Sequence, residues 1–268
     1  MQDFKMPIRE QFSNKGTFGK VLNFCGSENY IGASYLATVS SLKVGAGFTA
    51  LATLQQVIDS VSSILPEAVY LTREQGLEKI NDFSVVLFGC GVGLSEFSTK
   101  LLEDVLFKLK PNIPLILDAD GLNILAETNF KLPQNTIITP HPLEASRLLG
   151  VSLNYIINNL EDTAKALSSK YNVITVLKTH RTIICDKDLE IYTNQYGNSA
   201  LAKAGSGDVL AGIIAGLIAQ KMDLFEASKL GVYLHSRTGE IASEDLTEYS
   251  VLASDLPRYL HKAIREIL

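Results

Sequence analysis

Short apolar runs alternate along the chain with segments in which apolar residues recur every three or four positions. Seven of the runs are predicted strands: residues 20–25, 47–53, 67–72, 84–89, 113–118, 135–139 and 172–178. Most are continuous rather than alternating, which is typical of strands that are covered on both faces. Residues 181–185 and 189–194 instead predict a hairpin, with Lys187 and Asp188 near its turn.

Helical periodicity predicts the segments that lie between and after these strands. The predicted helices are Ile31–Val44, Ser95–Leu109, Pro142–Leu149, Tyr155–Tyr171, Ser206–Gln220, Leu224–Ser243 and Ser254–Ile267. Alternation of strand and helix through the first two thirds predicts a three-layer α/β/α fold with a mainly parallel central sheet. Since no repeat or linker divides the chain, we expect residues 1–268 to form one domain.

The composition favours an ordered globular protein and disfavours two classes of partner. Of 268 residues, 46% are hydrophobic and 20% are charged, a balance unlike that of disordered chains. The net charge of 24 − 29 = −5 argues against nucleic acid as a partner. The longest apolar run, Val209 to Ala219, is well short of the roughly 20 residues that span a bilayer, so no membrane partner is expected. Three isolated cysteines and a start unlike a targeting segment indicate a cytoplasmic protein.

Loops that follow the predicted strands are the first place to look for chemistry. Parallel sheets bind their ligands beyond the carboxyl ends of the strands. The loops in question are residues 26–34, 89–93, 118–123, 139–144 and 178–182. Together with residues 204–208, these loops predict that the ligand site lies on one face of the molecule.

The segment AGSGDVLAGIIAGL at 204–217 is the most informative of these. Gly205, Ser206 and Gly207 lead into a predicted helix, so their backbone N–H groups and the helix terminus suit the oxyanions of a phosphoryl group. Asp208, in the first turn, is then explained as a base that takes a proton from an attacking hydroxyl. An acid that merely complements the helix dipole explains the segment equally well.

Three other loops carry weaker signals. The glycines of GCGVG at 89–93 permit close approach to a ligand, but a tight turn requires them as well. Two prolines restrict the backbone around His141, which could donate to a ligand, and Glu144 could hold a metal-bound water. A surface histidine and an acid in the first turn of a helix are the alternatives, and the local sequence favours them.

Charged residues also end two of the predicted strands. Asp118 and Asp120 follow a buried strand. Asp120 could cap a helix or hold a hydroxyl-rich ligand, and capping is the expected role of at least one of the two acids. Lys178 and Arg181 lie in a strand-end loop, where they could neutralise the phosphate of a nucleotide. A solvated hairpin turn is the alternative for this loop.

Six segments, in this order, resemble the NAD(P)H-hydrate dehydratases: residues 26–47, 89–93, 117–123, 139–150, 177–182 and 197–217. The resemblance extends from about Lys20 to Ser243. It implies a ribokinase-like fold and a metabolite-repair lyase. Such an enzyme returns the S epimer of hydrated NADH or NADPH to NAD(P)H through a phosphorylated intermediate, with ADP giving AMP and phosphate, or with ATP as the donor.

The resemblance also implies where the ligands bind. It places substrate contacts on Ala33, Gly91, Gly93, His141 and Asp208. It places nucleotide contacts on Lys178, Thr179, His180, Arg181, Thr182 and Gly207. Asp208 is then expected to be the base, with the amides of residues 205–207 stabilising the transferring group. Mg²⁺ is the expected cofactor, and Glu144 is the candidate for an indirect contact with it.

Some residues depart from the family pattern. Leu143 replaces a usual glycine, Cys90 replaces a usual proline, and Lys203 stands in a segment that is commonly glycine-rich. None of these changes removes a group that the chemistry needs.

The resemblance also bears on partners and on rival functions. Because about twenty residues precede the matching region, no epimerase domain is expected here, and a separate epimerase would supply the S epimer. Members of the family are often tetramers, so a homo-oligomer is expected. A vitamin or sugar kinase of the same fold that uses ATP is the alternative function, and a nucleotide-binding module without turnover is another.

Overall fold

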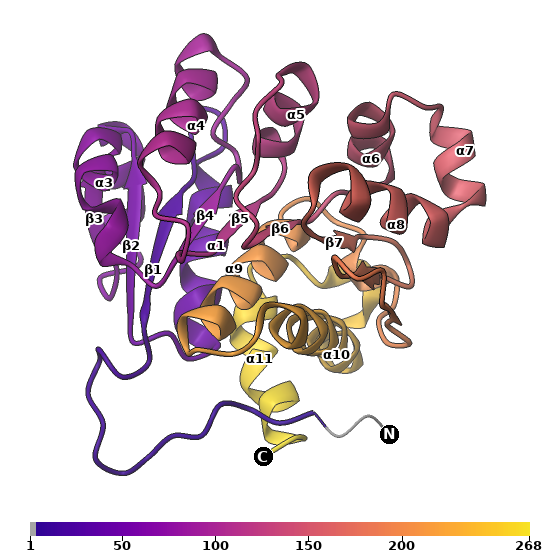
Figure 1. The fold of residues 1–268 in the computed structure, drawn as a ribbon. Coiled ribbons are helices and arrows are strands. Elements are labelled where there is room, and N and C mark those ends of the chain that lie inside the picture. Colours follow the sequence, from indigo (N-terminus) through magenta and orange to yellow (C-terminus); the bar gives the residue numbers. More distant parts are fainter. Residues whose placement is uncertain (1–3) are drawn as a thin grey trace.

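A nine-stranded sheet, in the order β3-β2-β1-β4-β5-β6-β7-β8-β9, forms the centre of the computed structural model, which describes residues 4–268 (Figure 1). The strands are β1 (Lys20–Phe24), β2 (Phe48–Thr53), β3 (Val69–Thr72), β4 (Val85–Phe88), β5 (Leu115–Leu117), β6 (Thr136–Ile138), β7 (Ile174–Leu177), β8 (Ile183–Cys185) and β9 (Ile191–Thr193). Strands β1 to β7 pair in parallel, whereas β8 and β9 are antiparallel. The predicted mainly parallel sheet and the predicted hairpin are both confirmed.

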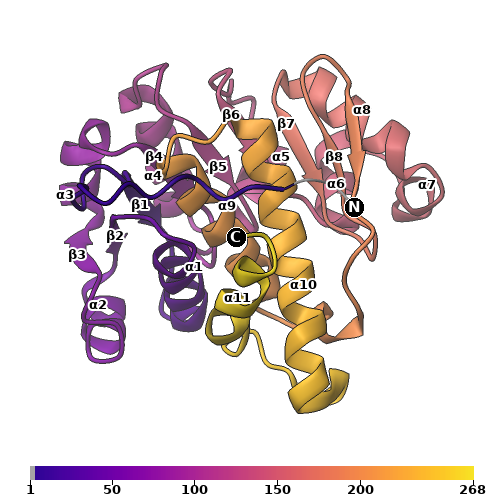
Figure 2. The same ribbon diagram turned by 90° about the horizontal axis from the view of Figure 1, so that it is seen from below.

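Helices cover both faces of this sheet. One face carries α1 (Ile31–Lys43), α2 (Gln55–Ser62), α9 (Ser206–Ala219), α10 (Leu224–Ser250) and α11 (Leu256–Arg265). The other face carries α3 (Arg73–Lys79), α4 (Glu96–Lys108), α5 (Asp120–Glu127), α6 (Pro142–Leu149), α7 (Leu153–Asn158) and α8 (Leu160–Tyr171). Figures 1 and 2 show the two layers, with the long helix α10 next to α9 and α11.

The two helical layers explain why most of the strands are largely apolar. Along β1, Val21 packs into the core under α1 and α9, whereas Leu22 and Phe24 pack into the core under α4 and α5. Successive side chains of a strand point to opposite faces, so most positions of both sets are apolar when both faces are covered, with the buried Asn23 of β1 as an exception.

Helix α9, which begins at the glycine-rich segment, packs closely against α1. An added Cβ at Gly212 would lie 2.2 Å from the Ala37 carbonyl oxygen, and one at Gly216 would lie 2.3 Å from Val44 Cγ1. Because only glycine permits this approach, the two backbones pack directly on each other. This packing positions α9 so that its first turn lies at the carboxyl edge of the sheet, near the residues that follow β4 and β5.

Several helices differ from the sequence prediction. Helices α2, α3 and α5 were not expected, and each has only seven or eight residues, too few for a clear period. The predicted helix Tyr155–Tyr171 is divided at Asn159, which leaves the helical region at φ −139° and ψ 53°. Helix α10 extends beyond the predicted Ser243 to Ser250, with a break at Thr247, which takes φ 66° and ψ 153°. Among residues 4–268, no helix is both long and apolar enough to cross a membrane.

Candidate active site

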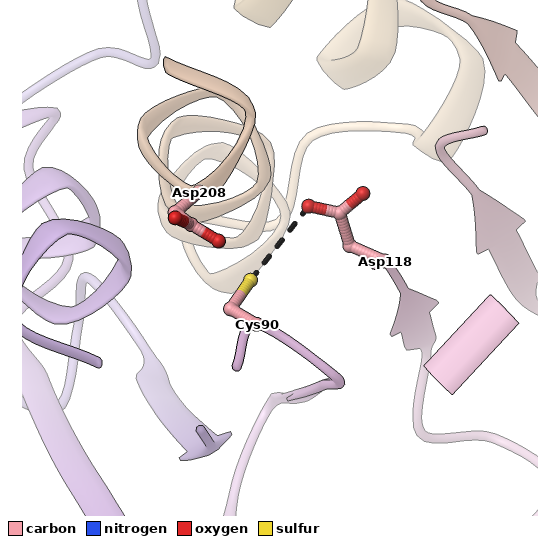
Figure 3. Close-up of side chains that lie close together, drawn as sticks. All are labelled: Cys90, Asp118 and Asp208. Atoms are coloured by element: carbon pink, nitrogen blue, oxygen red, sulfur yellow. Dashed lines mark hydrogen bonds between the residues drawn. The ribbon is translucent and has the colours of Figure 1, made fainter. Parts of the chain in front are cut away.

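Three side chains from different elements meet at the carboxyl edge of the sheet (Figure 3). Cys90 follows β4, Asp118 follows β5, and Asp208 lies in the first turn of α9. One Sγ or carboxylate oxygen atom from each lies within 4.8 Å of the others. The Cys90 thiol donates to Asp118 Oδ2 at 3.7 Å. These three residues, named the acid cluster below, form the centre of the candidate site.

The carboxylate of Asp118 is buried and fully engaged. Lys178 Nζ lies 2.6 Å from its Oδ1, and the Thr139 hydroxyl donates to the same oxygen at 2.7 Å. Burial opposes the charge of Lys178, but the carboxylates of Asp118 and Glu144 outweigh it and raise the pKa of the ammonium group. Lys178, the first residue of the 178–182 loop, therefore does not belong to a solvated turn, because it forms an ion pair within the site.

The expected capping role of Asp118 or Asp120 is wrong. The N-cap of α5 is Ala119, at φ 47°, and no side chain caps this helix. Asp120 is the first helical residue, and its Oδ2 accepts a hydrogen bond from the Gly93 N–H at 2.8 Å. Both acids find partners in other loops, which removes the cost that an unpaired buried carboxylate would carry.

Asp208 has the electrostatic character of a base that works near neutral pH. Burial raises the pKa of its carboxyl group to about 7, and the charge of Asp118 adds to the effect. A carboxylate with this pKa is deprotonated in a large fraction of molecules at pH 7 and still accepts a proton readily. An acid that only complemented a helix dipole would have its pKa lowered instead.

The segment 205–207 leads the chain into α9 beside the acid cluster. Gly205 is the N-cap and takes φ +90°, a conformation that favours glycine. An added Cβ at Gly207 would lie 3.2 Å from Lys178 Nζ. The Ser206 hydroxyl lies 2.9 Å from His235 Nε2, and burial lowers the pKa of His235 to about 4, so this histidine is neutral. The sequence assigns His235 no function.

A pocket of about 870 Å³ opens on one side of the acid cluster. All five residues of the predicted nucleotide loop line it, together with Ser206, Gly207, His141 and His235. Tyr196 also lines this pocket, and its ring packs edge-on against Tyr233 at 4.9 Å. The pocket is named the nucleotide pocket below because it gathers the residues that are predicted to contact the nucleotide.

Ala33, Gly91 and Gly93, three of the residues that are predicted to contact the substrate, lie in neighbouring segments. Gly91, at φ +66°, approaches α1 so closely that an added Cβ would lie 3.0 Å from the Ala33 Cβ. Gly93, at φ +83°, follows it in the same loop. This loop continues directly from Cys90, so Ala33, Gly91 and Gly93 border the acid cluster on the side away from the nucleotide pocket.

His141 and Glu144 cap helix α6 together. His141 Nδ1 accepts from the Leu143 N–H at 3.1 Å, and Glu144 Oε2 accepts from the His141 N–H at 2.8 Å. The position of Glu144 in the first turn of α6 agrees with the N-terminal helix acid that the local sequence favours, whereas the cap formed by the His141 side chain was not predicted. Burial raises the pKa of Glu144 to about 7. The positive charge of Lys178 opposes this rise and the negative charge of Asp118 adds to it. Glu144 therefore interacts electrostatically with the ion pair of Lys178 and Asp118.

The departures from the family pattern have distinct environments. Cys90 is fully buried in the acid cluster, where a proline could donate no hydrogen bond. Lys203 lines the nucleotide pocket, and its ammonium group donates to the Tyr249 carbonyl oxygen. Leu143 is exposed.

Comparisons with known proteins identify the family to which the chain belongs. Residues 21–262 match the family of NAD(P)H-hydrate dehydratases. A bifunctional NAD(P)H-hydrate repair enzyme of Coxiella burnetii is 37% identical over 254 residues, which cover 94% of this chain and 51% of that enzyme. An ADP-dependent (S)-NAD(P)H-hydrate dehydratase of Neisseria meningitidis is 36% identical over 242 residues, covering 88% of this chain and 81% of that protein.

A solved structure extends the agreement to the fold. The ADP/ATP-dependent NAD(P)H-hydrate dehydratase of Bacillus subtilis, co-crystallized with ATP and Mg²⁺, matches with a TM-score of 0.89 at 30% identity, covering 98% of this chain and 95% of that one. The predicted ribokinase-like fold is confirmed. The chain spans about half the length of the bifunctional relatives that it matches. The match of residues 21–262 and the shared fold place the chain in the NAD(P)H-hydrate dehydratase family.

Proposed function

We propose that this protein dehydrates the S epimer of NADH or NADPH hydrate to NAD(P)H, with ADP or ATP as phosphoryl donor. The observation that carries the proposal is the position of Asp208. Its carboxyl group, with a pKa raised to about 7, lies at the N-terminus of α9 between the nucleotide pocket and the Gly91–Gly93 loop. A hydroxyl of one ligand and a phosphate of the other can meet at this point.

The first step transfers a phosphoryl group to the substrate. Asp208 takes the proton of the ring hydroxyl while that oxygen attacks the terminal phosphorus, and the bond from phosphorus to the nucleotide breaks. Backbone amides of residues 205–207 stabilise the charge on the transferring oxygens, with the helix terminus behind them. With ADP as donor, the nucleotide product is AMP.

The second step expels the new phosphate ester. The lone pair of the ring nitrogen pushes out phosphate as the carbon–oxygen bond breaks, and loss of a proton from the adjacent ring carbon restores the dihydropyridine. Phosphate is a far better leaving group than hydroxide, which explains why a dehydratase uses a nucleotide. The sum is hydrate plus ADP giving NAD(P)H, AMP and phosphate.

The residues around the acid cluster fit a Mg²⁺ ion bound with the nucleotide. Magnesium prefers carboxylate oxygens and retains several waters. Glu144 Oε1 has its one close contact within the described chain at 3.4 Å from His141 Nε2, so this oxygen is available to a metal-bound water. When bound, the ion would neutralise charge on the phosphates. Glu144 would hold it indirectly.

Absorbance of the dihydropyridine band tests the proposal. Pure protein is mixed with chemically prepared NADH hydrate and Mg²⁺, with ADP, with ATP or without nucleotide. We expect absorbance to return only in the wells that contain a nucleotide, with release of phosphate. No return of absorbance in any well, from folded protein that binds nucleotide, would contradict the proposal and favour a kinase of hydroxylated small molecules.

A single methyl group at Gly207 is expected to slow the reaction. In Gly207→Ala, the new Cβ would lie 3.2 Å from Lys178 Nζ and displace the ammonium group within the site. We expect kcat/KM to fall about 10²-fold, because small misplacements of reacting groups carry penalties of this size. Gly16→Ala is the matched control, since a Cβ there lies at a similar distance from a side-chain atom, 3.1 Å from Asn14 Oδ1, but in an exposed turn before β1. Equal rates in the two variants would contradict the prediction.

The rate is expected to rise with pH through about 7. Asp208 acts as a base only when its carboxyl is deprotonated, and its pKa is raised to about 7. Below this pH, kcat/KM should therefore fall about tenfold per unit, and above it the rate should reach a plateau. Initial rates measured from about two pH units below this pKa to about two above it, at constant ionic strength, provide the measurement. A rate that stayed constant over the acid half of that range would exclude Asp208 as the titrating base.

A further inference from the structure

One side of the long helix α10 packs against α9 and against the short turn η2 (Ser199–Leu201) that precedes it (Figures 1 and 2). An added Cβ at Gly231 would lie 2.7 Å from a side-chain carbon of α9, and one at Gly239 would lie 2.6 Å from a side-chain carbon of η2. Residues four apart share a helix face, so His235 lies on this packed side, midway between the two glycines. The close approach of the backbone of α10 lets the imidazole ring reach the start of α9.

The His235 ring is hydrogen-bonded to the segment that leads into α9. Its Nε2 lies 2.9 Å from the Ser206 hydroxyl. Both residues are buried, at 8% and 5% exposure, yet both line the nucleotide pocket. Because burial lowers the pKa of His235 to about 4, the ring is neutral near neutral pH and carries one N–H donor and one lone pair. A buried polar pair therefore lies at the wall of the pocket, where it can act on a ligand.

The hydroxyl of Ser206 is the donor that this residue has to spare for a ligand. Its backbone N–H already donates to the Lys203 carbonyl oxygen at 3.2 Å. By contrast, no oxygen of residues 4–268 accepts from the N–H groups of Gly205 and Gly207. The segment thus presents two open amides with a hydroxyl between them. A serine hydroxyl has a single hydrogen, so its use depends on what the histidine does with its own proton.

The tautomer of His235 decides where the serine hydrogen points. If Nε2 carries no hydrogen, it accepts the hydrogen of Ser206, and the serine oxygen turns its lone pairs to the pocket. If Nε2 carries the hydrogen, it donates to Ser206 Oγ and leaves the serine hydrogen free for a ligand. Phosphate oxygens only accept hydrogen bonds, so a bound phosphoryl group favours the second arrangement. In a buried site the two hydrogen bonds of such a chain strengthen each other.

We propose that His235 is a positioning residue, which donates from Nε2 to Ser206 Oγ and so directs the serine hydroxyl at the transferring phosphoryl group. The inference rests on the proposed function, since phosphoryl transfer supplies the oxygens that the hydroxyl would contact. Ser206 touches the reacting group, whereas His235 acts through Ser206. A donor that is oriented before the reaction begins stabilises the developing charge without further reorganisation. The packed side of α10 holds the ring in the required place.

Two amide replacements that mimic different ring nitrogens test this inference. The side-chain nitrogen of glutamine reaches the position of Nε2, whereas that of asparagine reaches only the position of Nδ1. We expect His235→Gln to keep most of the wild-type kcat and His235→Asn to lower it about 3- to 10-fold, the range for one neutral hydrogen bond. The KM for NADH hydrate should not move in either variant, because His235 lines the nucleotide pocket. Equal kcat values for the two variants would overturn the inference.

A double-mutant cycle with Ser206 provides a second, independent test. Ser206→Ala should lower kcat about 10²-fold, as the loss of one oxyanion-hole donor typically does. Adding His235→Asn to Ser206→Ala should cause no further loss, because His235 acts through the missing hydroxyl. A further loss as large as the one in wild type would overturn the inference and show that the ring only supports packing.

Two further measurements complete the design. Ser168→Ala is the matched control for Ser206→Ala, since it removes a buried hydroxyl that lies 2.9 Å from the Thr175 hydroxyl, and it should keep the wild-type kcat. Wild-type protein is assayed in parallel with ADP and with ATP. Failure of wild type to dehydrate the hydrate with either nucleotide would overturn the proposed function and the inference with it, whereas the variants test the inference alone.

Discussion

Asp208→Asn is expected to abolish most of the turnover while the protein still binds nucleotide. Asparagine keeps the shape of the side chain but cannot take a proton, and a positioned general base typically contributes about 10²–10⁴-fold to rate. We therefore expect kcat to fall by that factor, with little change in the affinity for ADP, because Asp208 does not line the nucleotide pocket. Steady-state kinetics and calorimetric titration of ADP measure the two quantities separately.

A second acid at a helix start provides the control for Asp208. Asp162 lies in the first turn of α8, is exposed and is far in sequence from Asp208. Asp162→Asn removes only a helix-dipole interaction of about 0.3–1 kcal/mol and should keep full activity. If Asp208→Asn kept full activity as well, the dipole explanation of both acids would hold and the proposed base would be excluded.

The stability of Asp208→Asn should move in the direction opposite to its activity. The folded-state pKa of Asp208 is raised to about 7 from an ordinary value of 3.8. The wild-type folded state therefore binds an extra proton between these values and loses stability as the pH rises through them. Thermal unfolding should show the variant to be more stable than wild type above about pH 7, and this gain should vanish below about pH 4.

Lys178→Met is expected to be the most destabilising of these substitutions. It leaves the Asp118 carboxylate, 1% exposed, with no cation in contact, and loss of one partner of a buried pair typically costs about 3–5 kcal/mol. Urea unfolding followed by circular dichroism measures this loss. The variant should also lose activity, since the same ammonium group lies beside Gly207.

A surface pair of the same chemistry provides the matched control for Lys178. Lys262 lies 2.8 Å from Asp245, and the two side chains are 43% and 52% exposed. Lys262→Met should cost less than about 1 kcal/mol because solvent screens the pair. Adding Asp118→Asn to Lys178→Met should recover part of the lost stability, since it removes the orphaned charge. Equal losses for the two lysine variants would show that Asp118 does not need its cation.

The sequence by itself determined the architecture and the segments that form the site. Strands covered on both faces are largely apolar, so most of β1 to β7 are visible in the sequence as nearly continuous apolar runs. Because ligands of parallel sheets bind beyond the strand ends, the order of the runs was sufficient to locate the loops of the site. Helix α3 was missed although Thr72 and Gln75 form a capping box at its start, a signal that the sequence contains.

The tertiary structure alone decided which side chains act together. Lys178 and Asp118 are 60 residues apart, and they meet because β5, β6 and β7 are neighbours in the sheet. The local sequence at Asp118 favoured a helix cap instead, since capping needs only adjacent residues. Likewise, His235 meets Ser206, 29 residues away, only because α10 packs against α9. The pKa of Asp208 depends on burial by elements distant along the chain, and burial is a property of the packed molecule.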